Sequence, residues 1–304
     1  MNNSSFTIED TVFVDCPTSY EGRVVVPNGI TDIGDRALMF CNNVNEVVLP
    51  DTLEGIGMCA FHGCNFKEII IPPKCQYISD YAFLCCQSLK EIDLPEGMLV
   101  LGEATFCGCS ELERVKIPDS LRVIREEVFA CCEKLKSVTL PPNIEKIDAM
   151  AFAECKSLKE IAIPDSCRHL CYGVFKECTS LERAFIGDGV SNEQGGKNCF
   201  LDCTSLKYAK LSSNMACVIS GFFEGCTSLK EVVIPEGIEW IDVEAFKDCT
   251  SLETITLPRT TVELYDYAFE GCINLRQIKM PVHTVINTHT FDGCPESLTI
   301  ERYS

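Results

Sequence analysis

Apolar residues recur along the chain in one fixed phrase, which is clearest between residues 82 and 95. It reads Ala82-Phe83-x-x-Cys86, followed by Leu-x-x-Ile-x-Leu-Pro ending at Pro95. Twelve copies fill the chain, and successive copies lie 22 to 25 residues apart. The residues at the Phe position are Leu38, Phe61, Phe83, Phe106, Phe129, Phe152, Phe175, Phe200, Phe223, Phe246, Phe269 and Phe291. Self-similarity at this period predicts a solenoid, in which each repeat forms one coil that is stable only beside its neighbours.

Each repeat contains the signals of two short strands. In the clearest copy, Leu89, Ile92 and Leu94 mark the first strand, which ends at Pro95, where the missing N–H costs little. A turn follows, and Val100–Leu101 supplies a second apolar segment on the opposite wall of the coil. The repeat is therefore predicted to be mainly β.

The Ala-Phe-x-x-Cys segment predicts one short helical turn per repeat. An Asp, Ser or Gly precedes it, as Asp148 does before Phe152, and such residues commonly start helices. Phe and Cys three residues apart share one face of a helix. We therefore expect Phe152 and Cys155, and their equivalents, to point together into the interior.

Residues 1–30 do not follow the phrase and are predicted to form an N-terminal cap. Alternating Phe6 and Ile8 and the apolar run Val24–Val26 indicate strands around a polar turn. A solenoid needs such a cap because its first repeat would otherwise expose an apolar end and an unpaired strand edge. Residues 31–304 are predicted to form the solenoid, as a single domain with the cap.

The chain has 22 cysteines, of which twelve occupy the same repeat position. They are Cys41, Cys64, Cys86, Cys109, Cys132, Cys155, Cys178, Cys203, Cys226, Cys249, Cys272 and Cys294, and Cys16 is a candidate thirteenth member. Because the column is regular and the chain is long enough to build a core, we interpret these residues as small buried apolar side chains with a weak S–H donor.

These motifs resemble the BspA-like leucine-rich repeat family, also called the Treponema pallidum type. The resemblance rests on Leu-x-x-Ile-x-Leu-Pro and Ala-Phe-x-x-Cys at a 23-residue period and covers about residues 24 to 300. It implies a repeat solenoid: a right-handed leucine-rich repeat coil, mainly β with one short helical turn per repeat, and about twelve repeats of 23 residues. It also implies binding of proteins or host matrix rather than catalysis, and a cell-surface or secreted location.

Charge and composition narrow the choice of partner. The 45 acidic and 26 basic residues give a net charge of -19, which disfavours nucleic acid and anionic membrane surfaces. No apolar run reaches the roughly 18 to 20 residues that span a bilayer, so we expect no membrane insertion. The first ten residues lack the basic and apolar regions of a secretory signal, so a cytoplasmic location is expected if Met1 is the native start.

Residue types that support catalysis or cofactor binding are not arranged in any recognised pattern. The four histidines are scattered, and no phosphate-binding loop or nucleophile motif occurs. The stretch Cys167-Arg168-His169-Leu170-Cys171 has zinc-binding residue types without the spacing of a paired C-x2-C site. The sequence thus predicts no enzyme, no cofactor and no metal.

The outward positions of the first strands are the best candidates for binding because packing does not dictate them. Ala162 and Phe185 hold this position in neighbouring repeats, Lys210 follows, and Arg183 and Tyr208 lie close by. Exposed aromatic side chains with basic neighbours are typical of protein interfaces, although single exposed apolar residues are also common on any surface. We predict that these five residues bind a protein partner.

The repeat rhythm breaks between Ile186 and Cys199, where the usual Pro is lost and two residues are added. Such insertions often mark the binding face of a solenoid, so a loop is expected beside Phe185 and Tyr208. Whether the sheet or this loop carries the binding surface stays open.

The sequence therefore predicts a non-enzymatic protein-interaction or adhesion module, a monomer or weak oligomer, that binds a protein ligand through an extended sheet. Two alternatives remain: a thiol-rich metal or redox protein, and a purely structural spacer.

Overall fold

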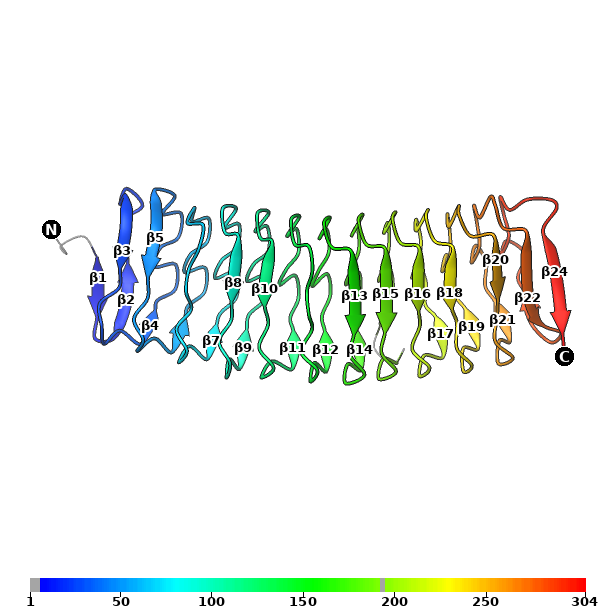
Figure 1. Ribbon diagram of the computed structural model, residues 1–304, viewed down its shortest axis with the longest axis horizontal. Helices are drawn as coiled ribbons and strands as arrows, with labels where there is room; N and C mark the ends of the chain where they lie inside the picture. Colours follow the sequence, from blue (N-terminus) through cyan, green and yellow to red (C-terminus); the bar gives the residue numbers. More distant parts are fainter. Residues whose placement is uncertain (1–5, 192–194) are drawn as a thin grey trace. The chain divides into compact units, whose positions relative to one another are not determined.

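The computed structural model describes residues 6–191 and 195–304, which form a β-solenoid of about thirteen turns. The chain divides into two compact units, Met1–Asn143 and Ile144–Ser304, called unit 1 and unit 2 below. Within each unit, one coil contributes a first strand and a shorter second strand, and the two kinds of strand lie in separate rows (Figure 1). The predicted division into residues 1–30 and 31–304 stays a prediction.

Unit 1 has its first strands in two pairs and most of its second strands in one longer sheet. The first strands are β3 (Gly22–Val25) with β5 (Val44–Val48), and β8 (Glu91–Asp93) with β10 (Arg114–Lys116). The longer sheet contains β1 (Thr7–Glu9), β2 (Val12–Asp15), β4 (Asp32–Ile33), β6 (Gly55–Ile56), β7 (Tyr77–Ile78) and β9 (Val100–Leu101). The second strand β11 (Val123–Ile124) is not part of this sheet. Pairing between successive coils is parallel, as in β8 and β10, where Ile92 faces Val115.

Unit 2 repeats the arrangement. Its first strands are β13 (Glu160–Ile163), β15 (Arg183–Ile186), β16 (Tyr208–Lys210), β18 (Glu231–Val233), β20 (Thr254–Thr256), β22 (Gln277–Pro281) and β24 (Thr299–Tyr303). Its second strands are β12 (Lys146–Ile147), β14 (His169–Leu170), β17 (Cys217–Val218), β19 (Trp240–Ile241), β21 (Glu263–Leu264) and β23 (Val285–Ile286). The first strands form one sheet in the order β13-β15-β16-β18 and another in the order β20-β22-β24.

The core consists of like residues stacked from coil to coil. The repeat phenylalanines from Phe61 to Phe269 are fully buried. Neighbouring rings such as Phe83 and Phe106 stack with centroids 5.3 Å apart, and in unit 2 Phe246 and Phe269 are 5.2 Å apart. Because each ring contacts the ring of the next coil, the burial that stabilises one coil is supplied by its neighbours.

The helical turn predicted for each repeat is wrong: none of residues 6–191 and 195–304 is helical. The Ala-Phe-x-x-Cys segment instead forms consecutive tight turns, because the residues two before and two after the Phe adopt positive φ. Around Phe61 these are Cys59 at 54° and Gly63 at 73°, and around Phe83 they are Tyr81 at 60° and Cys85 at 55°. An α-helix requires negative φ at every residue, so it cannot pass through these positions.

Alternate N–H groups of this segment donate in different directions. Cys64 N–H donates to the carbonyl of Phe61 within the coil at 3.0 Å, whereas Phe61 N–H donates to the carbonyl of Ala82 in the next coil at 2.7 Å. The turns are therefore hydrogen-bonded along the stack as well as within the coil. A helix would direct all these donors along its own axis.

The N-terminal strand β1 covers an edge of unit 1. It pairs antiparallel with β2, which in turn pairs parallel with β4. The Phe6 ring contacts the rings of Phe13 and Tyr20, with centroids 5.3 and 4.9 Å apart. Phe13 is fully buried and pairs in register with Ile33, so it occupies a second-strand position. The segment thus shields a strand edge that would otherwise be open. The predicted thirteenth place of Cys16 in the cysteine column is wrong, because its carbonyl accepts the S–H of Cys41 as the carbonyl of a repeat Phe does.

Candidate functional site

The column cysteines have a structural hydrogen bond in common. In unit 2 the Cys178 Sγ lies 3.2 Å from the carbonyl oxygen of Phe152, the repeat Phe of the preceding coil, and donates to it. Cys226 and Cys272 repeat this contact at 3.1 Å to Phe200 and Phe246. Unit 1 has the same contact, for example from Cys86 to Phe61 at 3.1 Å. The column therefore joins successive coils.

Burial makes column thiols such as Cys178 and Cys64 poor nucleophiles. It raises the pKa of Cys178 to about 12 and that of Cys64 to about 12, each from about 9. Since the thiolate is the reactive form, these side chains stay protonated and inert near neutral pH. No disulfide joins the cysteines, and in the described part of the chain no group of three or more His, Cys, Asp or Glu side chains is arranged to hold a metal ion.

The side chains in the Cys167–Cys171 stretch point to different partners. Cys167 Sγ lies 3.6 Å from the main-chain oxygen of His169, and Cys171 Sγ lies 3.5 Å from Asp148 Oδ1. Cys178 is engaged with Phe152 in the interior column. This arrangement supplies local hydrogen bonds to the turn around β14 and does not converge on one point.

The five residues predicted to bind a partner lie together on one sheet of unit 2. Ala162, Phe185 and Lys210 face one another across β13, β15 and β16, and Arg183 faces Tyr208 in the row beside them. The Phe185 and Tyr208 rings are tilted, with centroids 5.6 Å apart. Both rings are half-buried, whereas the other three side chains are exposed. We call these five residues the unit 2 patch.

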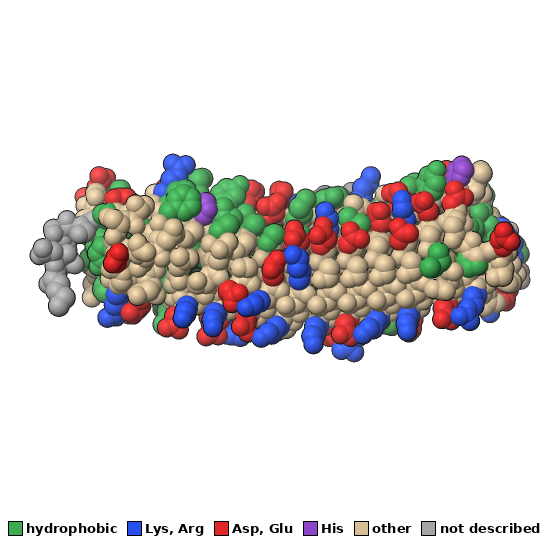
Figure 2. All heavy atoms as spheres, turned by 90° about the horizontal axis from the view of Figure 1, so that it is seen from above, with side chains coloured by type: hydrophobic (Ala, Val, Ile, Leu, Met, Phe, Trp, Pro, Cys, Tyr) green, Lys and Arg blue, Asp and Glu red, His purple; other side chains and the backbone are tan. Residues whose placement is uncertain are grey.

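Charged side chains surround the unit 2 patch. Arg183 pairs with Glu160 on β13, and Lys207 lies 2.9 Å from Glu182 across the next pair of strands. The hydrogen bond from Lys207 lowers the pKa of the Glu182 carboxyl. Lys210 forms no ion pair within the described residues of unit 2. Figure 2 shows basic side chains interleaved with acidic ones in a row along one side of the molecular surface.

The irregular stretch after Ile186 lies partly outside the described residues, since these exclude residues 192–194. One described end follows Phe185 directly through Ile186, the last residue of β15, and the other begins at Gly195. A Cβ placed on Gly196 would lie 3.5 Å from the Leu170 carbonyl oxygen, so this end packs over β14 among the second strands.

Unit 1 has a surface depression that the sequence analysis did not single out. Its volume is about 690 Å³, and it lies between the coil at residues 66–72 and β8. Ile70 lines it and is 84% exposed, although Ile69 and Ile71 on either side are buried. The available signal was the shortened repeat: one residue fewer separates Cys64 from Phe66 than separates Cys86 from Leu89.

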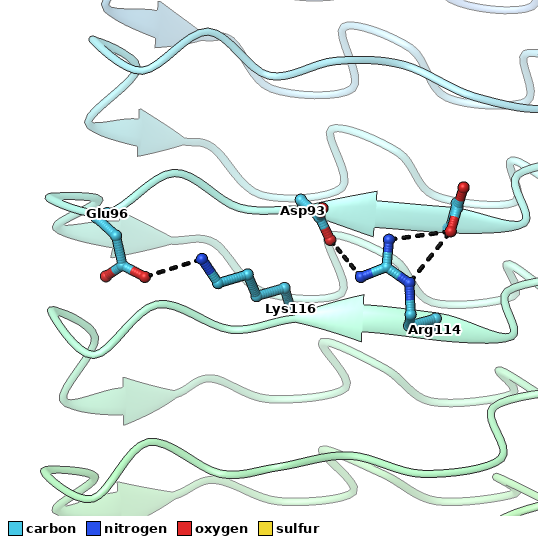
Figure 3. Close-up of polar contacts among 5 residues, drawn as sticks. Asp93, Glu96, Arg114 and Lys116 are labelled. Atoms are coloured by element: carbon cyan, nitrogen blue, oxygen red, sulfur yellow. Dashed lines mark hydrogen bonds and ion pairs between the residues drawn. The ribbon is translucent and has the colours of Figure 1, made fainter.

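Ion pairs cross one side of this depression (Figure 3). Arg114 on β10 reaches both Asp93 and Glu91 on β8, and Lys116 Nζ lies 3.2 Å from Glu96 Oε1 in the turn after β8. The bonds to these carboxylates raise the pKa of the Arg114 guanidinium. All these side chains are well exposed, so the pairs fix side-chain positions more than they stabilise the fold.

Stacked coils with buried leucine, isoleucine and phenylalanine columns define a leucine-rich repeat solenoid. More specifically, the chain belongs to the family described as BspA type leucine rich repeat region, which matches residues 6–129, 77–195 and 190–298. The family predicted from the repeat motifs is thereby confirmed. No curated protein matches the chain.

Solved structures agree with this family. A leucine-rich repeat protein from Bacteroides ovatus is 33% identical, with a TM-score of 0.87, over 96% of this chain and 77% of that one. A leucine-rich repeat protein from Eubacterium ventriosum is 22% identical, with a TM-score of 0.60, over 98% of this chain and 94% of that one. The pneumococcal vaccine antigen PcpA is 17% identical, with a TM-score of 0.58, over 100% of this chain and 88% of that one. The last two show the shared fold alone.

Over residues 6–191 and 195–304, no helix has the length and apolar character needed to cross a bilayer.

Proposed function

We propose that this protein is a non-enzymatic recognition module that binds a protein partner through the outward face of its first strands. The observation that carries this proposal is the unit 2 patch, in which a half-buried Phe185–Tyr208 pair lies between the basic side chains of Arg183 and Lys210. Aromatic and arginine side chains dominate binding energy at protein interfaces. Membership in a repeat family, rather than an enzyme family, supports a binding role.

The sheet is suited to binding because its backbone is already ordered. Four parallel strands, β13, β15, β16 and β18, hold the patch residues in fixed register. A surface that does not reorder on binding avoids part of the entropy cost of association. The outward side chains can then differ from coil to coil without disturbing the buried columns.

The proposal is tested by affinity capture from the native source, with the full chain as bait, followed by titration of the captured protein. Replacing Phe185 and Tyr208 together by Ser is expected to weaken binding at least tenfold, because central aromatic residues commonly contribute more than 1.4 kcal/mol. The matched control replaces Tyr172 and Tyr267, exposed tyrosines of unit 2 outside the first strands, by Ser. Unchanged affinity in the patch variant contradicts the proposed site.

A purely structural spacer is an alternative function. It predicts that nothing is captured specifically by the native chain, and that outcome would contradict the recognition role as a whole. The capture step therefore tests the function, and titration of the captured protein with the patch variant tests the site.

A further inference from the structure

The first-strand ladder of unit 1 is interrupted at two coils, residues 66–72 and residues 135–140. β5 pairs with β3 and β8 pairs with β10, but residues 66–72, which lie between β5 and β8 in the chain order, form no strand. The carbonyl of Lys67 accepts a hydrogen bond from Lys90 N–H at 3.0 Å. From Glu68 to Ile71 no further main-chain hydrogen bond is formed within the described residues of unit 1. Four consecutive residues thus leave main-chain donors and acceptors unused.

A shortened repeat accompanies the interruption at residues 66–72, whereas the interrupted coil at residues 135–140 has the ordinary spacing from Cys132 to Leu135. With one residue fewer between Cys64 and Phe66, the chain reaches the strand position early, although Phe66, Ile69 and Ile71 still fill the core. The side chains keep their inward and outward alternation, and the main chain is displaced from the ladder. The depression of about 690 Å³ opens at this coil.

Apolar side chains mark the same place on the outward face. Ile70 is 84% exposed, which is the largest exposure among the exposed large apolar residues of the described chain. The outward positions of the two preceding first strands are Val48, which is half-buried, and Val25, which is 49% exposed and paired in register with Val48. An apolar row therefore leads to the depression, and such rows mark interaction sites when polar residues border them.

The border of the depression is acidic. Four carboxylates, Glu68, Glu91, Asp93 and Glu96, line it with two cations, Arg114 and Lys116. Both cations are already paired with Glu91, Asp93 and Glu96, and Glu68 has no ion-pair partner within the described part of unit 1. Lys67 and Lys90 lie just outside the lining, one residue before Glu68 and Glu91. The depression itself therefore favours positive charge.

We propose that the Ile70 depression is a second binding site, specific for an extended protein segment that alternates apolar and basic side chains. An apolar side chain of this segment packs on Ile70, a basic one pairs with Glu68, and its main chain bonds to the unused groups of Glu68–Ile71. This mode is strand addition, in which main-chain bonds give affinity and alternate side chains give specificity. The site lies in unit 1 and does not depend on the unit 2 patch.

The test uses three capped synthetic peptides and the full chain. The probes are Lys-Val-Lys-Val-Lys, Glu-Val-Glu-Val-Glu and Lys-Ser-Lys-Ser-Lys, each titrated by calorimetry at low and physiological salt. The first peptide is expected to bind at least tenfold more tightly than either of the others. Ile70→Asp is expected to weaken its binding at least tenfold, and Glu68→Lys is expected to weaken it and reduce its salt dependence.

Two controls keep the outcome specific to this site. Ile273→Asp changes another exposed isoleucine, which is 59% exposed in unit 2, and is expected to leave peptide affinity unchanged. The Phe185→Ser and Tyr208→Ser double variant is also expected to bind the peptide normally. A wrong assignment of the unit 2 patch can therefore be told apart from a wrong assignment of the Ile70 depression. Equal binding of the Lys-Ser peptide, unchanged binding by Ile70→Asp, or no binding by the native chain would each overturn the proposal.

Discussion

At the scale of single residues, the column cysteine combines two properties that no other small side chain offers together. It fills the space beside the repeat Phe as an apolar group, and its S–H reaches the Phe carbonyl of the preceding coil, as from Cys203 to Phe175 at 3.1 Å. That carbonyl also accepts the N–H of Cys178 within its own coil at 3.2 Å. Alanine would lose the donor, and serine would bury a strongly hydrated hydroxyl.

The buried thiols predict a loss of stability at high pH. Below about pH 8 they are largely protonated in the folded and unfolded states alike, so they add little pH dependence. Between about pH 8 and 12 the unfolded chain releases these protons, but Cys178, whose pKa burial raises to about 12, keeps its own in the folded state. The free energy of unfolding should therefore fall, by up to about 1.4 kcal/mol per pH unit for each thiol.

Urea unfolding followed at pH 7, 8, 9, 10 and 10.5 measures this effect. The midpoint should be level up to about pH 8 and should then fall. Cys178→Ala is expected to be less stable at pH 7 but to fall less steeply above about pH 8, since one titrating thiol is gone. A native midpoint that stays level to pH 10.5 would show that the thiols titrate alike in both states.

At the scale of the structural element, the turn segment depends on two residues with positive φ. Gly adopts this conformation without steric strain, whereas in other residues the strain costs about 1 kcal/mol of stability. The chain places Gly at some of these positions, such as Gly271 at 70°, and larger residues at others, such as Glu177 at 59°. The conformation is therefore imposed by the stack of coils and not by local preference.

Glu177→Gly should stabilise unit 2 by about 0.5 to 1 kcal/mol because it removes the strain at φ 59°. The matched control is Lys176→Gly, where φ is not positive and Gly should destabilise by a similar amount. Both variants break the same Lys176–Glu177 ion pair, whose atoms lie 3.2 Å apart, so the difference between them reports the backbone alone. Thermal melting of both variants measures it, and equal melting temperatures would refute the argument.

The repeat phrase was enough to predict the buried columns, the short strands and the adjacency of the unit 2 patch. Periodicity determines which side chains share a face, so Phe185 and Lys210 could be placed together from the sequence. The helical turn was wrong because i and i+3 spacing suits a helix and a run of tight turns equally. Only the backbone φ angles distinguish a helix from such turns. Residue types such as Tyr81 and Met150, which adopt positive φ here, do not predict it from the sequence.

Side-chain contacts between coils could not be predicted from the sequence either. The ring of Tyr77 lies across Gly55 on the neighbouring strand, where a Cβ would meet its Cζ, and its hydroxyl bonds to Asp32 two strands away. This bond raises the pKa of Tyr77 to about 12. The repeat spacing places Asp32, Gly55 and Tyr77 at equivalent positions, but it does not show in which direction the Tyr77 side chain points. The Ile70 depression was missed for a related reason, since a spacing of 22 residues looked like ordinary variation.

At the scale of the whole molecule, the repeat family and the buried columns imply that coils are interchangeable in the interior and distinct on the surface. Each coil offers its neighbour the same apolar column and the same main-chain acceptors, as the bonds Phe61 to Ala82 and Phe83 to Thr105 show. A nearest-neighbour description of stability therefore applies.

Deleting residues 91–113, which joins Lys90 to Arg114, should leave a folded and cooperatively unfolding protein. The deletion removes one full period, and Glu91 and Arg114 already occupy equivalent positions in the register of β8 and β10. Circular dichroism and urea unfolding measure the result. Deleting residues 91–101 instead removes half a period and should destroy the fold of unit 1. Similar behaviour of the two deletions would contradict the interchangeability of coils.

The main-chain bonds between turns also bear on how such a surface changes over evolutionary time. Loss of residues 91–113 would bring Arg114 and Lys116 directly beside the coil of Glu68 and Ile70, in place of Glu91 and Asp93. The border would then hold Glu68 and Asp119 with Arg114 and Lys116, so its net negative charge would be lost without a single amino-acid replacement. Recombination between repeats could thus change the charge of a recognition surface in one genetic event, while the buried Phe and Cys columns continue through the junction.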